Sequence, residues 1–260
     1  MKTSISYIGL HHRLREIKTG IAILSLGVLV AAIVFTSLRK YELDLWRQKF
    51  ESESSKITNN FRQNILTNED ILLSIKSFYE VKKDVSQDDF VKFTDSLIKK
   101  HKFIKALEWI PRVSFDDIKS FEKQNQKAFP NFRIYRKDPT SNLKIPLEIK
   151  ADYYPVTFLN PVYENQTAIG FDLSSNEVRL KAIKESVLKR KTIMTSKIKL
   201  IQDEENSGSV LLFYPYFKDS LTSLSGVEFK GFFLGVFRIQ SLVETAVNMD
   251  HLNDMNLQIL

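Results

Sequence analysis

The side chains that could carry out catalysis or bind a metal are few in this chain, and their spacing predicts neither activity. Its 260 residues contain no cysteine, which excludes disulfides, zinc–thiolate sites and cysteine nucleophiles. The sequence also lacks a Gly-rich phosphate loop, a nucleophile elbow and a calcium loop. The histidines are not spaced with carboxylates as a metal site requires; they are His11, His12, His101 and His251. We therefore expect no catalytic residue, no metal and no cofactor.

Charged residues form clusters that have ordinary structural explanations. The carboxylate pairs Asp116-Asp117 and Glu204-Glu205 are adjacent in sequence, so on a helix or strand they point apart and serve as caps or surface residues. A basic cluster could bind an anion, but Glu177 and Glu185 lie among its members, which favours a solvated face. That cluster consists of Lys181, Lys184, Lys189, Arg190, Lys191, Lys197 and Lys199. The formal net charge of +7 does not by itself indicate nucleic acid as a partner.

The elements that position any site begin with an uncharged stretch near the N-terminus. Residues 19–38, TGIAILSLGVLVAAIVFTSL, form a run long enough for a helix to cross the hydrocarbon core of a membrane. A cleaved signal peptide is less favoured because apolar residues continue past VLVAA. The basic residues on the two sides nearly balance, so the positive-inside rule gives no clear orientation. The short tail, 1–18, favours a cytoplasmic N-terminus in the cytoplasmic (inner) membrane and a periplasmic or extracellular main domain.

A long helix is predicted directly after the membrane segment. Apolar side chains recur from Leu43 to Tyr79 with an average spacing near the helical repeat, and Asn68 is the expected point of any interruption. This stalk, residues 39–77, either lies along its own domain or forms a homodimer contact continuous with the membrane helix. The two arrangements are compatible, and both stay open at this point.

Beyond the stalk the pattern predicts an α+β fold. Helices that open at Ser86, Ser114 and Ser174, each with an acidic residue three positions later, alternate with strands up to residue 189. After residue 190 strands follow one another with short connections, and such strands pair antiparallel. We expect an antiparallel sheet with helices to one side and a boundary between two subdomains, 78–189 and 190–260.

Several stretches together resemble the CHASE domain, an extracytoplasmic sensor found in front of histidine kinases, diguanylate cyclases, phosphodiesterases and plant cytokinin receptor kinases. They occur in the family's order from about Phe78 to the C-terminus. The stretches are ALEWIPRVSFDDIKSFEK, YYPVTFLNPVYENQTAIGFDLSSNEVRLKAI, TIMTSKIKLIQ, VLLFYPYF and GFFLGVFRIQSLVE. The resemblance implies a long membrane-proximal helix and two PAS-like modules with antiparallel sheets, and it places the ligand in the membrane-distal module, 78–189. It also implies that this chain is the input part of a longer receptor.

The resemblance further implies a binding pocket without catalytic groups. We expect its walls at the strand around Trp109, at 154–159 and near Thr195, where aromatic area and hydroxyl groups could orient an unknown small molecule. The candidate contacts are Trp109, Tyr154, Thr157, Phe158 and Thr195. The intervening turn is expected to depend on Pro155 at a sheet edge, on Gly170 for an unusual backbone angle and on Asp172 as a helix cap.

The ligand cannot be named from these residues, but one class is disfavoured. The plant receptors carry an aspartate that hydrogen-bonds the adenine-type ligand, and the corresponding position here is Pro161, which has no polar side chain and no N–H. We therefore expect cytokinins not to bind with useful affinity. A second class of function fits the same sequence: an exported interaction or dimerisation module on a stalk that binds no small ligand. A periplasmic hydrolase is disfavoured by the missing catalytic motifs.

Overall fold

The computed structural model describes the backbone of residues 4–82, 84–138, 141, 143–200, 208–219 and 226–246, and side chains from residue 15 to 245 within those ranges. The chain divides into two compact units, Met1–Ile57 and Thr58–Leu260. His251 and the pair Glu204-Glu205, which the sequence analysis assessed, lie outside the described residues.

The first unit consists of the N-terminal part of helix α1 (Ser4–Val81). Among the described residues there is one helix long and apolar enough to cross a membrane, as the sequence predicts, and its most apolar window buries nothing inside the protein. The hydroxyls of Thr19, Ser25 and Thr36 donate to backbone carbonyls one turn earlier, at 2.7 to 2.9 Å. These polar groups therefore need no water, which suits a helix surrounded by lipid.

Helix α1 is continuous, as the periodicity predicts, and it has no interruption at Asn68. Asn68 lies inside the helix and is 1% exposed, because this part of α1 packs on the second unit's core. Leu72 and Ile75 are fully buried there, whereas Trp46 and Phe50 in the first unit are exposed. The C-terminal turns of α1 therefore pack on their own domain, whereas Trp46 and Phe50 are not covered by any residue that the structure describes.

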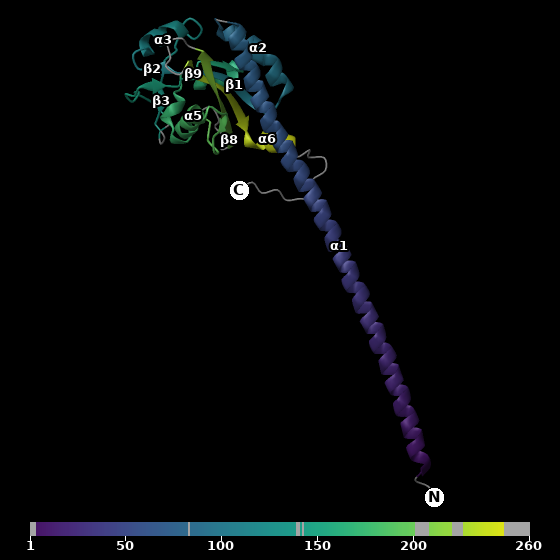
Figure 1. The fold of residues 1–260 in the computed structure, drawn as a ribbon. Coiled ribbons are helices and arrows are strands. Elements are labelled where there is room, and N and C mark those ends of the chain that lie inside the picture. The colour runs from purple at the N-terminus through teal and green to yellow at the C-terminus, as the bar shows by residue number, and fades with distance from the viewer. Residues whose placement is uncertain are drawn as a thin grey trace. The chain divides into compact units, whose positions relative to one another are not determined.

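The second unit is built on one five-stranded antiparallel sheet (Figure 1). The order of its strands is β6-β1-β9-β8-β7, and every neighbouring pair is antiparallel, which confirms the predicted α+β class. The sheet combines strands from both sides of residue 190, so the change of pattern there does not separate two large sheets. The strands are β1 (Ile104–Pro111), β6 (Phe158–Asn160), β7 (Ile193–Met194), β8 (Ser209–Asp219) and β9 (Val227–Arg238).

Helices cover both faces of this sheet, and not one face as expected (Figure 1). On one face, α5 (Glu177–Lys189) packs in a core cluster with Phe232 of β9. On the other, α2 (Gln87–Lys100) and the end of α1 pack in a second cluster with Phe233. Successive residues of a strand point to opposite faces, and Gly231 to Phe237 are all buried, so apolar side chains of β9 need cover on both sides.

Smaller elements surround the sheet. Among the predicted helix starts, Ser86 forms the expected capping box with Asp89, but the N-cap of α5 is Asn176 and not Ser174. A third apolar cluster contains Val113, Phe132 and Ile134. The remaining elements are β2 (Val113–Ser114), which pairs with β5 (Asp152–Tyr153), α3 (Ile118–Asn125), β3 (Arg136–Lys137), which pairs with β4 (Lys144–Ile145), α4 (Val162–Asn165), the 3-10 turns η1 (Gln166–Ala168) and η2 (Leu173–Ser175), and α6 (Ile239–Ala246).

Gly170 occupies a position that only glycine fits. Its φ is +81°, and a Cβ added there would lie 2.1 Å from the carbonyl oxygen of Arg133. Its backbone bonds in two directions, because its N–H donates to Val156 O at 2.8 Å and its carbonyl accepts from Tyr135 N at 3.0 Å. Gly170 thus links the segment at Tyr135 to the segment at Val156 through its backbone.

We predict that Gly170→Ala destabilises the fold far more than Gly226→Ala. Both glycines have positive φ, so both substitutions add backbone strain of about 1–2 kcal/mol. Only Gly170 adds a backbone clash, because a Cβ at Gly226 would meet no atom within 4 Å. Urea unfolding followed by the fluorescence of Trp109 measures the difference. Equal losses of unfolding free energy would contradict the close approach seen here.

Candidate functional site

Trp109 and Phe158, two of the predicted contacts, are direct neighbours across the β1–β6 pair. Both pack on the sheet face covered by α1 and α2. The Trp109 ring lies 4.8 Å from that of Phe233 and 5.1 Å from that of Tyr79 on α1. In this arrangement the two predicted side chains are part of an aromatic cluster that fixes the end of α1 to the sheet.

Tyr154 lies on the opposite face of the sheet. It packs against the cluster under α5, with its ring 5.8 Å from that of Phe232 and 6.4 Å from that of Phe229. Burial raises the pKa of the Tyr154 hydroxyl to about 12, so the group is neutral at physiological pH. The structure therefore does not bring Tyr154 together with Trp109.

The hydroxyls of the two predicted threonines bond to nearby backbone. Thr157 is buried, and its Oγ1 donates to the carbonyl of Pro155 at 3.1 Å. Thr195 follows β7 at the other edge of the sheet, and its Oγ1 accepts from the N–H of Leu211 at 3.0 Å. Within the described part of the chain, the five predicted contacts thus divide between two sheet faces and opposite sheet edges, and their contact with a ligand stays a prediction.

Asp172 organises the turn that the sequence analysis singled out. Its carboxylate is 1% exposed, and Oδ1 accepts from the N–H of Tyr154 at 2.9 Å and from Ser174 Oγ at 2.7 Å. The same oxygen accepts from the N–H of Ser174, at the start of η2, and Oδ2 pairs with the ammonium group of Lys150. Pro155 forms a bridge with Asp172. This buried charge is fully partnered, so its role in the fold is to hold the strand at Tyr154 against the turn.

A second acid and a base are buried on the α5 side of the sheet and interact electrostatically without forming an ion pair with each other. Glu108, in the centre of β1, is 3% exposed, and Arg179, in the first turn of α5, is 5% exposed. Neither forms an ion pair with any residue that the structure describes. Arg179 Nη2 donates to Lys199 O at 3.2 Å, but its Nε, which is also buried, has no partner among the described residues.

Burial shifts the pKa values of both groups toward their neutral forms. It raises the pKa of Glu108 to about 8, although the positive charge of Arg179 acts in the opposite direction. It lowers the pKa of Arg179 to about 10, which leaves the guanidinium charged at neutral pH. A protonated or ionised Glu108 could donate or accept a hydrogen bond, and Arg179 Nε could donate one. Groups perturbed in this way concentrate at functional sites, so this Glu108–Arg179 pair is our candidate site.

Sequence analysis missed this pair, although each residue leaves a signal. Glu108 lies at the centre of β1, and Ala106 and Ile110, two residues away on either side, both face the core under α5. Residues two apart on a strand point to the same face of the sheet. Arg179 precedes Ala182 and Ile183 by three and four residues, which places it on the buried side of α5. In both elements, a charged residue therefore occupies a position that the surrounding apolar pattern assigns to the core, and this is the signal in the sequence.

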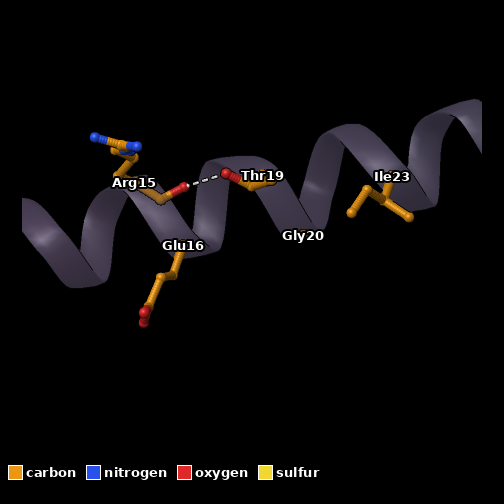
Figure 2. Close-up of a pocket in the computed structure, with 5 residues that line it drawn as sticks. All are labelled: Arg15, Glu16, Thr19, Gly20 and Ile23. Atoms are coloured by element: carbon orange, nitrogen blue, oxygen red, sulfur yellow. Dashed lines mark hydrogen bonds between the residues drawn. The ribbon is translucent and has the colours of Figure 1, made fainter.

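Three surface hollows in the described residues involve none of the predicted contacts. Figure 2 shows one of them, along α1, where Gly20 leaves the helix surface bare between Glu16 and Ile23. All of its lining comes from a single helix, so it cannot enclose a ligand. A second, lined in part by Glu69 and Arg190, has a volume of about 350 Å³. The third is lined by three basic residues, one acidic residue, a serine and four apolar residues.

Comparison with known families agrees with the α+β architecture described above. The family model of the CHASE domain matches residues 83–260, which is more than half of the chain. The chain therefore belongs to the CHASE domain family, whose members are extracytoplasmic sensory domains and not catalysts. No curated protein matches the chain. The matched region begins just after α1, whose last turns nevertheless form one wall of the core.

We predict that Glu108 makes the fold less stable as pH rises from about 4.5 to about 8. In this window the unfolded state releases the proton that the folded state retains, so the free energy of unfolding falls, by at most about 1.4 kcal/mol per pH unit for one proton. Glu108→Gln should remove this slope, and Glu177→Gln, at an exposed position of α5, should keep it. Urea unfolding at pH 5, 6, 7 and 8 measures it; an unchanged slope in Glu108→Gln would contradict the assignment.

Proposed function

We propose that this chain is the input part of a membrane-anchored receptor that binds a small molecule outside the cytoplasm. The family match over residues 83–260 is the observation that carries the proposal. The apolar run at 19–38 would cross the cytoplasmic membrane once, with residues 1–18 inside and the second unit outside. The output domain of the longer protein would be a histidine kinase or a diguanylate cyclase or phosphodiesterase, by resemblance to the family.

The Glu108–Arg179 pair supports a ligand site between the sheet and α5. Burying the charged guanidinium of Arg179 with an unpartnered Nε, next to the carboxyl group of Glu108, costs free energy, and a polar ligand that hydrogen-bonds to both groups would remove part of that cost. Such a ligand would present an acceptor to Arg179 Nε and a polar group to Glu108. Tyr154, on the same face, is the predicted contact that fits this location best. Trp109 and Phe158, on the opposite face, would then act through their packing with α1 and α2.

The contact between α1 and the sheet supports a route for the signal. The amide of Asn68 and the hydroxyl of Tyr79 are buried there and have no partner among the described residues. These unsatisfied polar groups raise the free energy of the observed packing of α1 on the sheet. A second position of α1 would therefore differ little from it in free energy. A ligand changes this equilibrium only if it binds the two arrangements with different affinity.

The sheet itself supports a PAS-like unit. Numbered along the chain, its strands lie in the order 2-1-5-4-3, with the helix α5 on one face. We propose one PAS-like sheet that spans the boundary expected near residue 190, with the small β2–β5 and β3–β4 ladders as additions to it.

A second candidate function is an exported dimerisation module without a ligand. It is favoured by the apolar side chains of α1 that remain exposed, because Leu43, Trp46 and Phe50 are each about 60% exposed or more. The homodimer would be formed through this part of α1. Sensing and dimerisation are compatible, and only the binding of a small molecule separates the two functions.

We predict that at least one member of a panel of small polar metabolites raises the melting temperature of the full chain in phosphatidylcholine nanodiscs. A ligand that binds only the folded state at 100 times its Kd adds about 2.7 kcal/mol of stability. Arg179→Gln should abolish the shift, and Arg190→Gln, at an exposed position after α5, should preserve it. Isopentenyladenine serves as the expected non-binder.

The panel tests two questions separately: whether the chain binds a small molecule, and whether that molecule binds at the Glu108–Arg179 pair. A shift that survives in Arg179→Gln would show a sensor whose ligand binds elsewhere. A complete absence of shifts, in a protein that still dimerises through α1, would favour the interaction module.

A further inference from the structure

The third hollow, of about 270 Å³, lies where β1 begins and β9 ends. Lys102 precedes β1, Lys105 belongs to β1, and Arg238 is the last residue of β9. One carboxylate, Glu164 of α4, also lines the hollow and pairs with Lys105 at 3.3 Å. Among the described residues that line the hollow, three are therefore basic and one is acidic.

The other lining residues complete a small enclosure. Ser241 supplies a hydroxyl from the first turn of α6, and the N-terminus of a helix carries a partial positive charge from its N–H groups. The rest of the lining is apolar and comes from Ile98, Phe103, Ile104 and Pro161. The hollow therefore combines basic side chains and one hydroxyl with an apolar surface.

The surroundings strengthen the positive potential. The neighbouring Lys99 is paired with Asp95 at 2.6 Å, but Lys100 adds a charge beside the hollow. Burial, and in second place the charge of Lys100, lowers the pKa of the neighbouring His101. Like charges gathered in this way repel one another, and a bound anion would relieve the repulsion.

We propose that this basic hollow binds a phosphate group, carried either by a free small molecule or by a lipid headgroup. The basic side chains of the hollow favour an anion, and a phosphate group is negatively charged near neutral pH both as a monoester and as a lipid diester. Lysine binds phosphate as a point charge, and arginine binds it through paired N–H groups. The apolar wall would accept the carbon next to the phosphate.

This site is separate from the proposed sensory function. It shares no residue with the Glu108–Arg179 pair or with the five contacts predicted from sequence. An occupant would touch the start of β1, α4 and the first turn of α6 at once. It would therefore hold α6 against the end of the sheet whether or not a ligand is bound under α5.

The test is a titration of the full chain in phosphatidylcholine nanodiscs with inorganic phosphate at constant ionic strength, followed by the melting temperature. We expect a saturable rise. Lys102→Ala should weaken binding about tenfold, the typical effect of losing one charge-assisted hydrogen bond. Glu164→Gln should tighten binding, because it removes the one carboxylate among the described lining residues and releases Lys105 from its ion pair. Lys181→Ala, at an exposed position of α5, is the matched control and should change nothing.

The lipid composition identifies the source of the phosphate. If phosphatidylglycerol nanodiscs raise the melting temperature of the phosphate-free protein and remove the response to added phosphate, the occupant is a headgroup. If the response persists there, the occupant is a free phosphate compound. Either result supports the proposal. It is overturned by the lack of a saturable response in phosphatidylcholine, by an equal response to chloride, or by equal behaviour of Lys102→Ala and Lys181→Ala.

Discussion

The need to cover both faces of one apolar sheet determines the rest of this structure. β9 lies at the centre of that sheet, and its side chains alternate between the cluster under α5 and the cluster under α1 and α2. Because Leu72 and Ile75 are fully buried in the second cluster, the end of α1 is part of the folded domain. The helix that contains the apolar run therefore also closes the core of the sensory domain.

Two sets of buried ionisable groups in this domain differ in their partners: Asp172, and the Glu108–Arg179 pair. The carboxyl group of Asp172 is satisfied by Lys150, Ser174 and the backbone of Tyr154, so it stabilises a fixed turn. Glu108 and Arg179 are equally buried and lack direct partners of this kind, and burial shifts both pKa values toward the neutral form. The first arrangement is typical of a structural network, and the second is typical of a site completed by something else.

The sequence predicted the parts of the fold that depend on local pattern. The helical periodicity of α1, the capping box at Ser86 and the antiparallel pairing of consecutive strands all follow from spacing and turn chemistry. The single sheet did not follow, because the pairing of β1 with β9 joins residues more than a hundred positions apart, and no local signal encodes it. For the same reason the predicted contacts Trp109 and Tyr154 were assigned to one pocket, although the sheet lies between them.

The central claim is that the second unit lies outside the cytoplasm, tied to the membrane by one apolar helix. The absence of cysteine permits a direct test, because a single cysteine introduced at Leu188, which is 84% exposed, is the only thiol in the chain. A membrane-impermeant maleimide is applied to intact cells, with Ser4→Cys as the marker for the opposite side. The account predicts that Leu188→Cys reacts in intact cells and that Ser4→Cys reacts only after lysis. The reverse pattern would contradict it.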